Sequence, residues 1–274
     1  MDILETDAIS LGVDPDFGAR VMRMADRRSG RDWLVGGPPE GSAAEDAGYG
    51  GKAARGWDEC FPTVLSCTDA FWGRLRDHGV LWGRPWRTVD RGATHATHVF
   101  DGTDFTFGRT IALAGAAVEV RYELANLGDA PMPWMWSQHC LLALRPGEVF
   151  TLDGLGPLVS RGGRFAPGPV EGPEAGRAVK GYAPVAGAAR AGVSGPDGGI
   201  VFEWEEACVG HCGIWCDYGG WPAEDPVHQV AIEPTTAPAD DLSGAGTARL
   251  VLDPGARSTW SIRITLKTSQ EALT

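Results

Sequence analysis

The sequence has little positive charge, no long apolar run and almost no helical periodicity, and each absence excludes a class of protein. Lysine and arginine number 24 against 36 aspartates and glutamates, for a net charge of −12 at pH 7. Nucleic acids and anionic membranes are therefore not expected as partners, because both attract basic surfaces. No apolar stretch is long enough to cross a bilayer. The opening residues, MDILETDAIS, lack the basic and apolar segments of a secretory signal. We expect a soluble cytoplasmic protein.

Cysteine is also scarce, with six in 274 residues. A chain of this size without a secretory signal does not need disulfides, so we expect reduced thiols. Cys208, Cys212 and Cys216 are spaced by four residues, with His211 between them. This spacing matches no specific zinc or iron–sulfur pattern, and small buried thiols are the favoured interpretation. No metal site is predicted.

Strand patterns recur along the chain. Alternating or β-branched runs, bounded by turn-rich segments, predict strands at 105–114, 116–126, 132–144, 199–206, 228–233, 248–254 and 259–266. The last two resemble a hairpin around DPGARS. Residues 36–56 and the Gly/Pro-rich region 154–198 are predicted to be long loops or insertions, with short strands in the second. The expected fold class is all-β, a single large antiparallel β-sandwich forming one domain over residues 1–274.

The stretch VAIEPTTAPADDL, residues 230–242, contains an unusual carboxylate. Glu233 precedes a proline, which favours extended backbone and cannot donate to a sheet, so the strand is predicted to end there. Strand alternation puts Glu233 on the face of Ala231, away from Val230 and Ile232. A carboxylate beside a small residue suits the rim of a cavity. The alternative is a surface glutamate at a strand end.

Two histidines are candidates for chemistry. In MPWMWSQHCLLAL, alternation puts His139 on the face of Ser137 and Leu141. It is either a satisfied core histidine or a catalytic group. His78 precedes Gly79 in a Trp-rich loop, where a glycine permits close approach of backbone or ligand. It either contacts a ligand or makes a backbone hydrogen bond.

Aromatic and polar side chains near these motifs suit sugar binding. Eleven tryptophans outnumber nine phenylalanines and four tyrosines. Most are expected in the core, but Trp82 and Trp215 are candidate platforms for the apolar face of a sugar ring. Arg84 either reaches a hydroxyl or acidic substituent or lies at the surface. Asp217 either binds sugar hydroxyls or starts a turn before two glycines.

Five motifs in order, GWDECFPTV, DHGVLWGRPW, WMWSQHCLLAL, GIWCDYGGWP and VAIEPTTAPADDL, resemble the aldose 1-epimerase, or galactose mutarotase-like, family. The resemblance implies a β-sandwich with a sugar pocket and interconversion of α and β anomers without metal or organic cofactor. By motif, Glu233 resembles the general base and His139 the general acid. His78 resembles the histidine that binds and polarises the sugar near its ring oxygen. The Asp217 segment approaches the pocket in the family.

The pattern also departs from the family. The Asn-Arg pair that precedes the first histidine in galactose mutarotases is absent, and that histidine lacks the usual double glycine. The divergent branch of the family is therefore the nearer match, and a free aldose is a better prediction than a hexose 6-phosphate. The alternative function is a carbohydrate-binding protein without turnover. A metal-dependent, cupin-like isomerase would need His and Glu at ligand spacing, which the sequence does not have.

Overall fold

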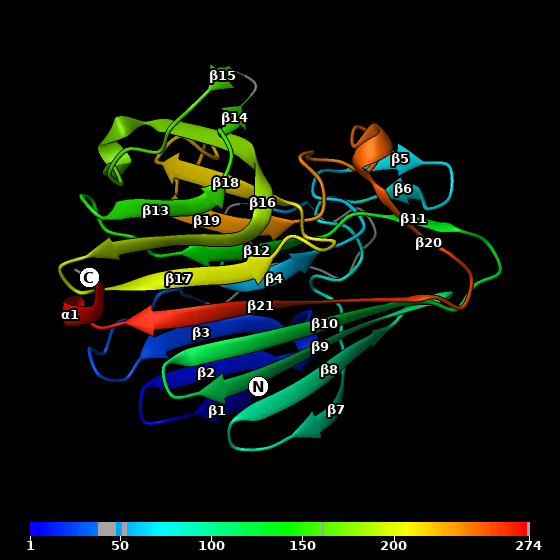
Figure 1. Cartoon of the computed structure of the whole chain (residues 1–274), viewed down its shortest axis with the longest axis horizontal. Helices are drawn as coiled ribbons and strands as arrows, with labels where there is room; N and C mark the ends of the chain where they lie inside the picture. Colours follow the sequence, from blue (N-terminus) through cyan, green and yellow to red (C-terminus); the bar gives the residue numbers. More distant parts are fainter. Residues whose placement is uncertain (38–47, 51–53, 161, 273–274) are drawn as a thin grey trace.

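Two antiparallel sheets lie face to face in the structure, a computed structural model that describes residues 1–37, 48–50, 54–160 and 162–272 (Figure 1). The first sheet contains, in order of pairing, β1 (Asp2–Glu5), β2 (Ile9–Asp14), β3 (Arg20–Asp26), β4 (Trp57–Cys60), β12 (Ser137–Leu142), β19 (His228–Thr235), β18 (His211–Tyr218), β16 (Arg177–Gly195), β14 (Val159–Ser160) and β15 (Gly163–Arg164). The second sheet contains β7 (Arg87–Arg91), β8 (His95–Asp101), β9 (Phe105–Ala114), β10 (Ala117–Asn126), β21 (Arg257–Lys267), β17 (Gly198–Glu205), β16 again and β13 (Val149–Leu155). The predicted all-β antiparallel fold class is confirmed.

The remaining elements are short. β5 (Cys67–Asp69) pairs with β6 (Gly73–Leu75), and β11 (Met132–Trp134) pairs with β20 (Leu250–Leu252), at one end of the molecule (Figure 1). The helical segments are η1 (Pro15–Phe17), η3 (Pro173–Ala175), η4 (Gly246–Ala248) and α1 (Ser269–Ala272). Within the described part of the chain, no helix has the length and apolar character that crossing a bilayer requires.

Side-chain alternation builds the core between the sheets. Alternate residues of β9 and of most of β21 point inward and are buried, while the residues between them are more exposed. In β12 and β19 nearly every residue is buried, on both faces. The inner face packs in the main core, and the outer face is covered by loop residues such as Tyr49 and Trp82, which pack on Leu141 and Ala231. Polar side chains on that outer face are therefore enclosed.

The longest strand, β16, joins the two sheets. Its first half pairs with β18 and its second half with β17, with Gly187 at φ +77° between them. Figure 1 shows this strand as a long curved ribbon. The prediction of a long loop or insertion with short strands over 154–198 is therefore wrong for 177–195, which form one continuous strand. Ten of these nineteen residues are alanine or glycine, so the strand has little apolar alternation, and ladder hydrogen bonds to neighbours far away in sequence determine it.

Three smaller predictions are also corrected. The segment 132–144 forms two strands, β11 and β12, which belong to different sheets. The last two predicted strands form no hairpin, because β20 pairs with β11 whereas β21 pairs with β10 and β17. β19 does not end at Glu233 but continues to Thr235. Pairing between distant segments decides all three, and local turn chemistry does not reveal it.

Candidate active site

Strand register brings polar side chains into one row across the first sheet. Asp58 of β4 is the register partner of His139 of β12. The β12–β19 register, fixed by Ser137 opposite Thr235 and by two further pairs, places His139 opposite Glu233. An acid–base pair separated by more than ninety residues in sequence thus shares one face of neighbouring strands.

Pro234 lies inside β19, in register with Cys212 of β18, at a point where the pairing of β19 with β12 is interrupted. Between Ser137 and Leu141, β12 pairs with β4, and no β12–β19 pair is formed by Ile232, Glu233 or Pro234. A proline lacks the N–H that a continuous ladder would need. The interruption explains why the strand continues past Glu233. It also leaves Glu233 and His139 facing each other without ladder bonds between their backbones.

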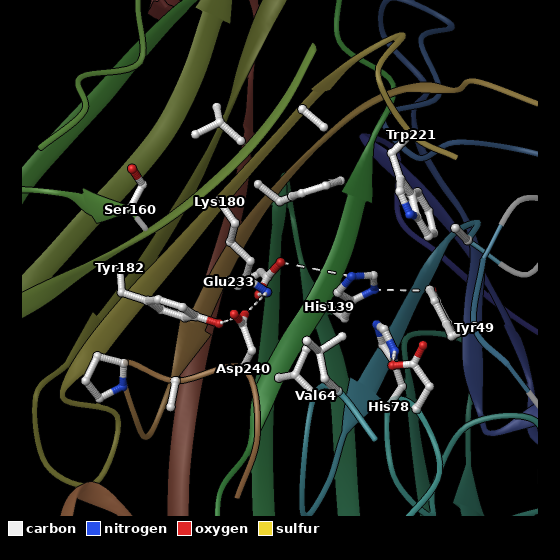
Figure 2. Close-up of a pocket in the computed structure, with 18 of the residues that line it drawn as sticks. Tyr49, Val64, His78, His139, Ser160, Lys180, Tyr182, Trp221, Glu233 and Asp240 are labelled. Carbon is white, nitrogen blue, oxygen red and sulfur yellow. Dashed lines mark hydrogen bonds and ion pairs between the residues drawn. The ribbon is translucent and has the colours of Figure 1, made fainter. Parts of the chain in front are cut away.

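A cavity of about 780 Å³ lies over this row. The predicted residues Glu233, His139, His78 and Trp215 all line it. Polar and aromatic residues that share the lining include Tyr49, Asp77, Lys180, Tyr182, Trp221 and Asp240. Figure 2 shows Glu233 and His139 pointing toward each other, with His78 and Tyr49 on one side and Tyr182 and Asp240 on the other. The volume is within the range typical of small-molecule sites.

Glu233 is buried, with one oxygen held and the other free of hydrogen bonds. Its Oε2 is 2.8 Å from the Lys180 Nζ and accepts from the Ser137 Oγ at 3.3 Å. Its Oε1 has no hydrogen-bond partner and lies 4.0 Å from the His139 Nε2. Burial acts to raise the pKa of Glu233, but the positive charges of Lys180 and then His139 outweigh it, so the pKa lies below its ordinary value. The carboxylate is ionised at neutral pH.

Asp58 and Tyr49 orient the His139 ring by contacting the nitrogen that lies away from Glu233. Its Nδ1 lies 3.4 Å from the Asp58 Oδ1 and 3.2 Å from the Tyr49 hydroxyl, so Nε2 faces Glu233 and the cavity. The Arg20 Nη2 lies 2.5 Å from the Asp58 Oδ2. Burial acts to raise the pKa of Asp58, but Arg20 and His139 hold it at about 2. A permanent carboxylate thus fixes the ring and attracts its positively charged form.

His78 sits on a strained turn that aims it into the cavity. Its φ is +59°, and Gly79 follows with φ +71°, where an added Cβ would lie 2.0 Å from the Phe61 carbonyl oxygen. The ring stacks on Tyr49 at 3.6 Å, and Nδ1 lies 3.0 Å from the Asp77 Oδ1. Burial lowers the pKa of His78, so the ring is neutral at pH 7. Because a carboxylate only accepts, Nδ1 carries the hydrogen and the unpartnered Nε2 is an acceptor.

Asp217 is not brought to the cavity. It is buried, and its Oδ1 accepts from the backbone N–H groups of Gly220 and Trp221, at 2.9 and 3.1 Å. The structure thus favours the turn interpretation over direct hydroxyl binding. Since Trp221 lines the cavity beside Trp215, with ring centroids 6.2 Å apart, Asp217 supports an aromatic wall.

Trp82 and Arg84 are likewise not among the described residues that line the cavity. Trp82 is fully buried, packs edge-on against Tyr49 at 5.2 Å, and donates its indole N–H to the Asp77 carbonyl at 2.7 Å. It therefore supports the wall that contains His78. The Arg84 carbonyl accepts from the Gly18 N–H at 2.7 Å. Both residues flank Gly83 in a turn, and the sequence does not show toward which side of the sheet their side chains point.

Sequence reasoning missed five polar residues of the site, namely Tyr49, Asp58, Lys180, Tyr182 and Asp240. Lys180 and Tyr182 are two residues apart and share one face of β16, but that segment was predicted to be a long loop or insertion with only short strands. Tyr49 lies in the other predicted loop. Asp58 had a usable signal, because in WDEC strand alternation puts it on the face opposite Glu59. Asp240 follows the Glu-Pro motif closely, which was a second available signal.

The structure offers no metal-binding cluster in the part of the chain that it describes: no three His, Cys, Asp or Glu side chains are arranged to hold an ion. All six cysteines are free thiols. Cys212 and Cys216 are buried in the main core, while Gly213 and Trp215 of the same strand face the cavity. The described residues that line the cavity offer carboxylates, imidazoles, an ammonium group and hydroxyl groups.

No protein-family profile matches the chain, and no curated protein matches it significantly. Solved structures match its fold. A galactose mutarotase related enzyme from Lactobacillus acidophilus superposes with a TM-score of 0.74 at 14% identity, covering 98% of each chain. A galactose mutarotase-like protein from Clostridium acetobutylicum gives 0.70 at 14% identity, covering 97% of this chain and 94% of that one. An Escherichia coli K12 protein, provisionally assigned as an aldose 1-epimerase, gives 0.73 at 14% identity, covering 97% and 98%. The chain therefore has the fold of the galactose mutarotase-like proteins, at low sequence identity to them.

Proposed function

We propose that the protein interconverts the α and β anomers of a free sugar by acid–base ring opening. The observation that carries the proposal is the 4.0 Å distance between the His139 Nε2 and the Glu233 Oε1, which has no hydrogen-bond partner, in two side chains that line the cavity. A hemiacetal carries its C1 hydroxyl and its ring oxygen on the same carbon. Its opening therefore needs a base and an acid within a few ångströms of each other.

Each group has one task in the proposed reaction. Glu233 takes the proton of the C1 hydroxyl while His139, as imidazolium, gives its Nε2 proton to the ring oxygen, and the C1–O bond of the ring breaks. The resulting aldehyde turns about C1–C2 and presents its other face. The C5 oxygen then attacks C1, His139 takes back its proton and Glu233 returns one to O1. Asp58 holds the His139 ring throughout.

His78 and the tryptophans would position the sugar. The neutral His78 presents an acceptor at Nε2, so it accepts a hydrogen bond from a sugar hydroxyl instead of protonating the ring oxygen. Trp215 and Trp221 line the cavity and offer flat apolar surface for the C–H face of the ring. This arrangement suits a neutral, hydroxyl-rich ligand.

The charge of the cavity predicts that sugar phosphates are poor substrates. Among the described residues, Lys180 is the only lysine or arginine in the lining, and it is paired with Glu233. Asp77, Glu233 and Asp240 are acidic. Since a phosphate dianion would face these carboxylates, we expect anomer exchange of a free aldose to exceed that of its 6-phosphate by at least about tenfold. Parallel NMR exchange measurements on both sugars check this, and equal rates would contradict it.

Gly213 is predicted to be required for the geometry of the base. An added Cβ would lie 3.1 Å from the Glu233 Oε2 and 3.2 Å from the Tyr182 Cε1. Gly213→Ala should shift Glu233 by a few tenths of an ångström and slow exchange roughly tenfold, since a misplacement of 1 Å can cost about 100-fold. Gly210→Ala is the matched control, because nothing lies within 4 Å of its Cβ position. Equal exchange rates in the two variants would show that Gly213 has no such role.

Magnetisation-transfer NMR on a panel of free aldoses and uronic acids tests the function directly. The wild-type protein should accelerate exchange between the anomer resonances of at least one sugar. Sugars that bind with shifted resonances, but without accelerated exchange, would instead favour a binding protein on the same fold. Treatment with a chelator should leave the exchange rate unchanged, because the proposed acid and base are side chains.

A further inference from the structure

Lys180 occupies an unusual place beside the base. It lies on β16, opposite Trp215 of β18, with 17% of its side chain exposed. Its Nζ is 2.8 Å from the Glu233 Oε2 and 3.9 Å from the Asp240 Oδ1. Gly213, which has no side chain, leaves room for this approach. A lysine in such an enclosed site is retained only when it is paired.

We propose that Lys180 is a positioning residue for the base, which keeps Glu233 ionised and turns its Oε1 toward the sugar. This inference rests on the proposed function. The ammonium and the Ser137 hydroxyl occupy Oε2. Rotation of the carboxylate would exchange the held and free oxygens only by breaking both contacts. The free Oε1 therefore stays on the side of His139.

The charges around Glu233 single out Lys180. The groups that face the carboxylate are Lys180 and Tyr182 from β16, His139 from β12, His78 from the 76–79 turn and Asp240 from the segment after β19. Two buried thiols, Cys60 of β4 and Cys212 of β18, also lie within electrostatic range of it. Lys180 is the nearest cation, at 2.8 Å against 4.0 Å for His139. Asp240 and Tyr182 are acids and cannot replace it. Without Lys180, burial would dominate and the carboxyl would favour its protonated form.

Asp240 and Tyr182 brace the ammonium on its other side. The Tyr182 hydroxyl donates to the Asp240 Oδ1 at 2.7 Å, and the same oxygen attracts the Lys180 Nζ. The ammonium thus lies between two carboxylates. Burial acts to lower the pKa of Lys180, but Glu233 and Asp240 raise it above its ordinary value. Lys180 is therefore charged across the working pH range and serves as a fixed cation.

The test compares Lys180→Met and Lys180→Gln with Lys180→Arg, which keeps the charge. Lys267→Met, at the last residue of β21, opposite Gly199 of β17, is the matched control. In the first two variants we expect the acid limb of the pH–rate profile, where exchange is lost as Glu233 is protonated, to shift to higher pH by about one unit or more. Lys180→Arg and Lys267→Met should keep the acid limb at the wild-type pH. A purely structural role would lower the rate at all pH values without moving the limb.

A ¹³C-carboxyl titration of Glu233, with its resonance assigned by its loss in Glu233→Gln, gives a readout that does not need turnover. The Glu233 resonance should titrate at higher pH in Lys180→Gln than in wild type. An unchanged titration and an unchanged acid limb would overturn the role of Lys180. If the wild-type protein accelerates exchange of no sugar, the proposed function fails, and the titration still decides whether Lys180 holds Glu233 ionised. If Lys180→Met does not fold, Lys180→Gln, which can still donate to Glu233, carries the test.

Discussion

Replacing Glu233 by glutamine is expected to slow anomer exchange by about 1,000-fold. General-base catalysis contributes roughly 10²–10⁴-fold, and an amide cannot take the C1 proton. Glutamine has the same shape and can still accept from Ser137, so the cavity should persist. Magnetisation transfer measures the rate, and saturation-transfer difference NMR on the same samples should show that the sugar still binds.

The matched control for this variant is Glu123→Gln. Glu123 lies on β10 in the second sheet, is partly exposed and pairs with Arg257, far from the row that contains Glu233. Exchange should be unchanged in this control. A Glu233→Gln protein that is folded, binds sugar and exchanges anomers within threefold of the wild-type rate would remove Glu233 from the role of base.

Replacing Arg20 by methionine is expected to destabilise the protein by about 3–5 kcal/mol at pH 7. The Arg20–Asp58 pair is buried, with side-chain exposures of 0% and 1%. Removing one member of such a pair leaves an uncompensated buried charge, which typically costs about that much. Urea denaturation measures the free energy of unfolding. His139 loses part of its support as well, so exchange should slow in the folded variant.

The destabilisation by Arg20→Met is expected to depend on pH through the ionisation of Asp58. The folded pKa of Asp58 is about 2, below the unfolded value near ~3.9. Its contribution to stability is therefore present above the unfolded pKa and lost as pH falls through 2. In Arg20→Met, burial acts without Arg20 and the carboxyl protonates more readily. The destabilisation relative to wild type should thus be smaller at pH 4 than at pH 7.

A double variant separates charge from packing. Arg20→Met with Asp58→Asn leaves no buried charge at this position, so it should be more stable than Arg20→Met alone. If the double variant is instead less stable by the sum of the two single effects, the pair does not act through its charges. The comparison needs only unfolding curves at pH 7.

Strand faces were predictable where the side chains alternate clearly. The prediction for 105–114 matches β9, and the one for 259–266 lies within β21. The same rule put His139 on the face of Ser137, and the structure finds both near Glu233. The alternation rule failed for β16, because its many alanines and glycines do not distinguish an apolar face from a polar one. The lysine that holds the base lies in that strand, so its role was invisible in the sequence.

The sequence by itself determined which side chains share a face, because alternation along an extended chain is local. It thereby placed Glu233 away from Val230 and Ile232, and the family resemblance assigned it a role. Only the tertiary structure decided what stands opposite. The β12–β19 register sets His139 opposite Glu233, and the pairing of β16 with β18 places Lys180 beside the held oxygen. The reason is physical: charge and register depend on neighbours across the sheet, which are distant in sequence.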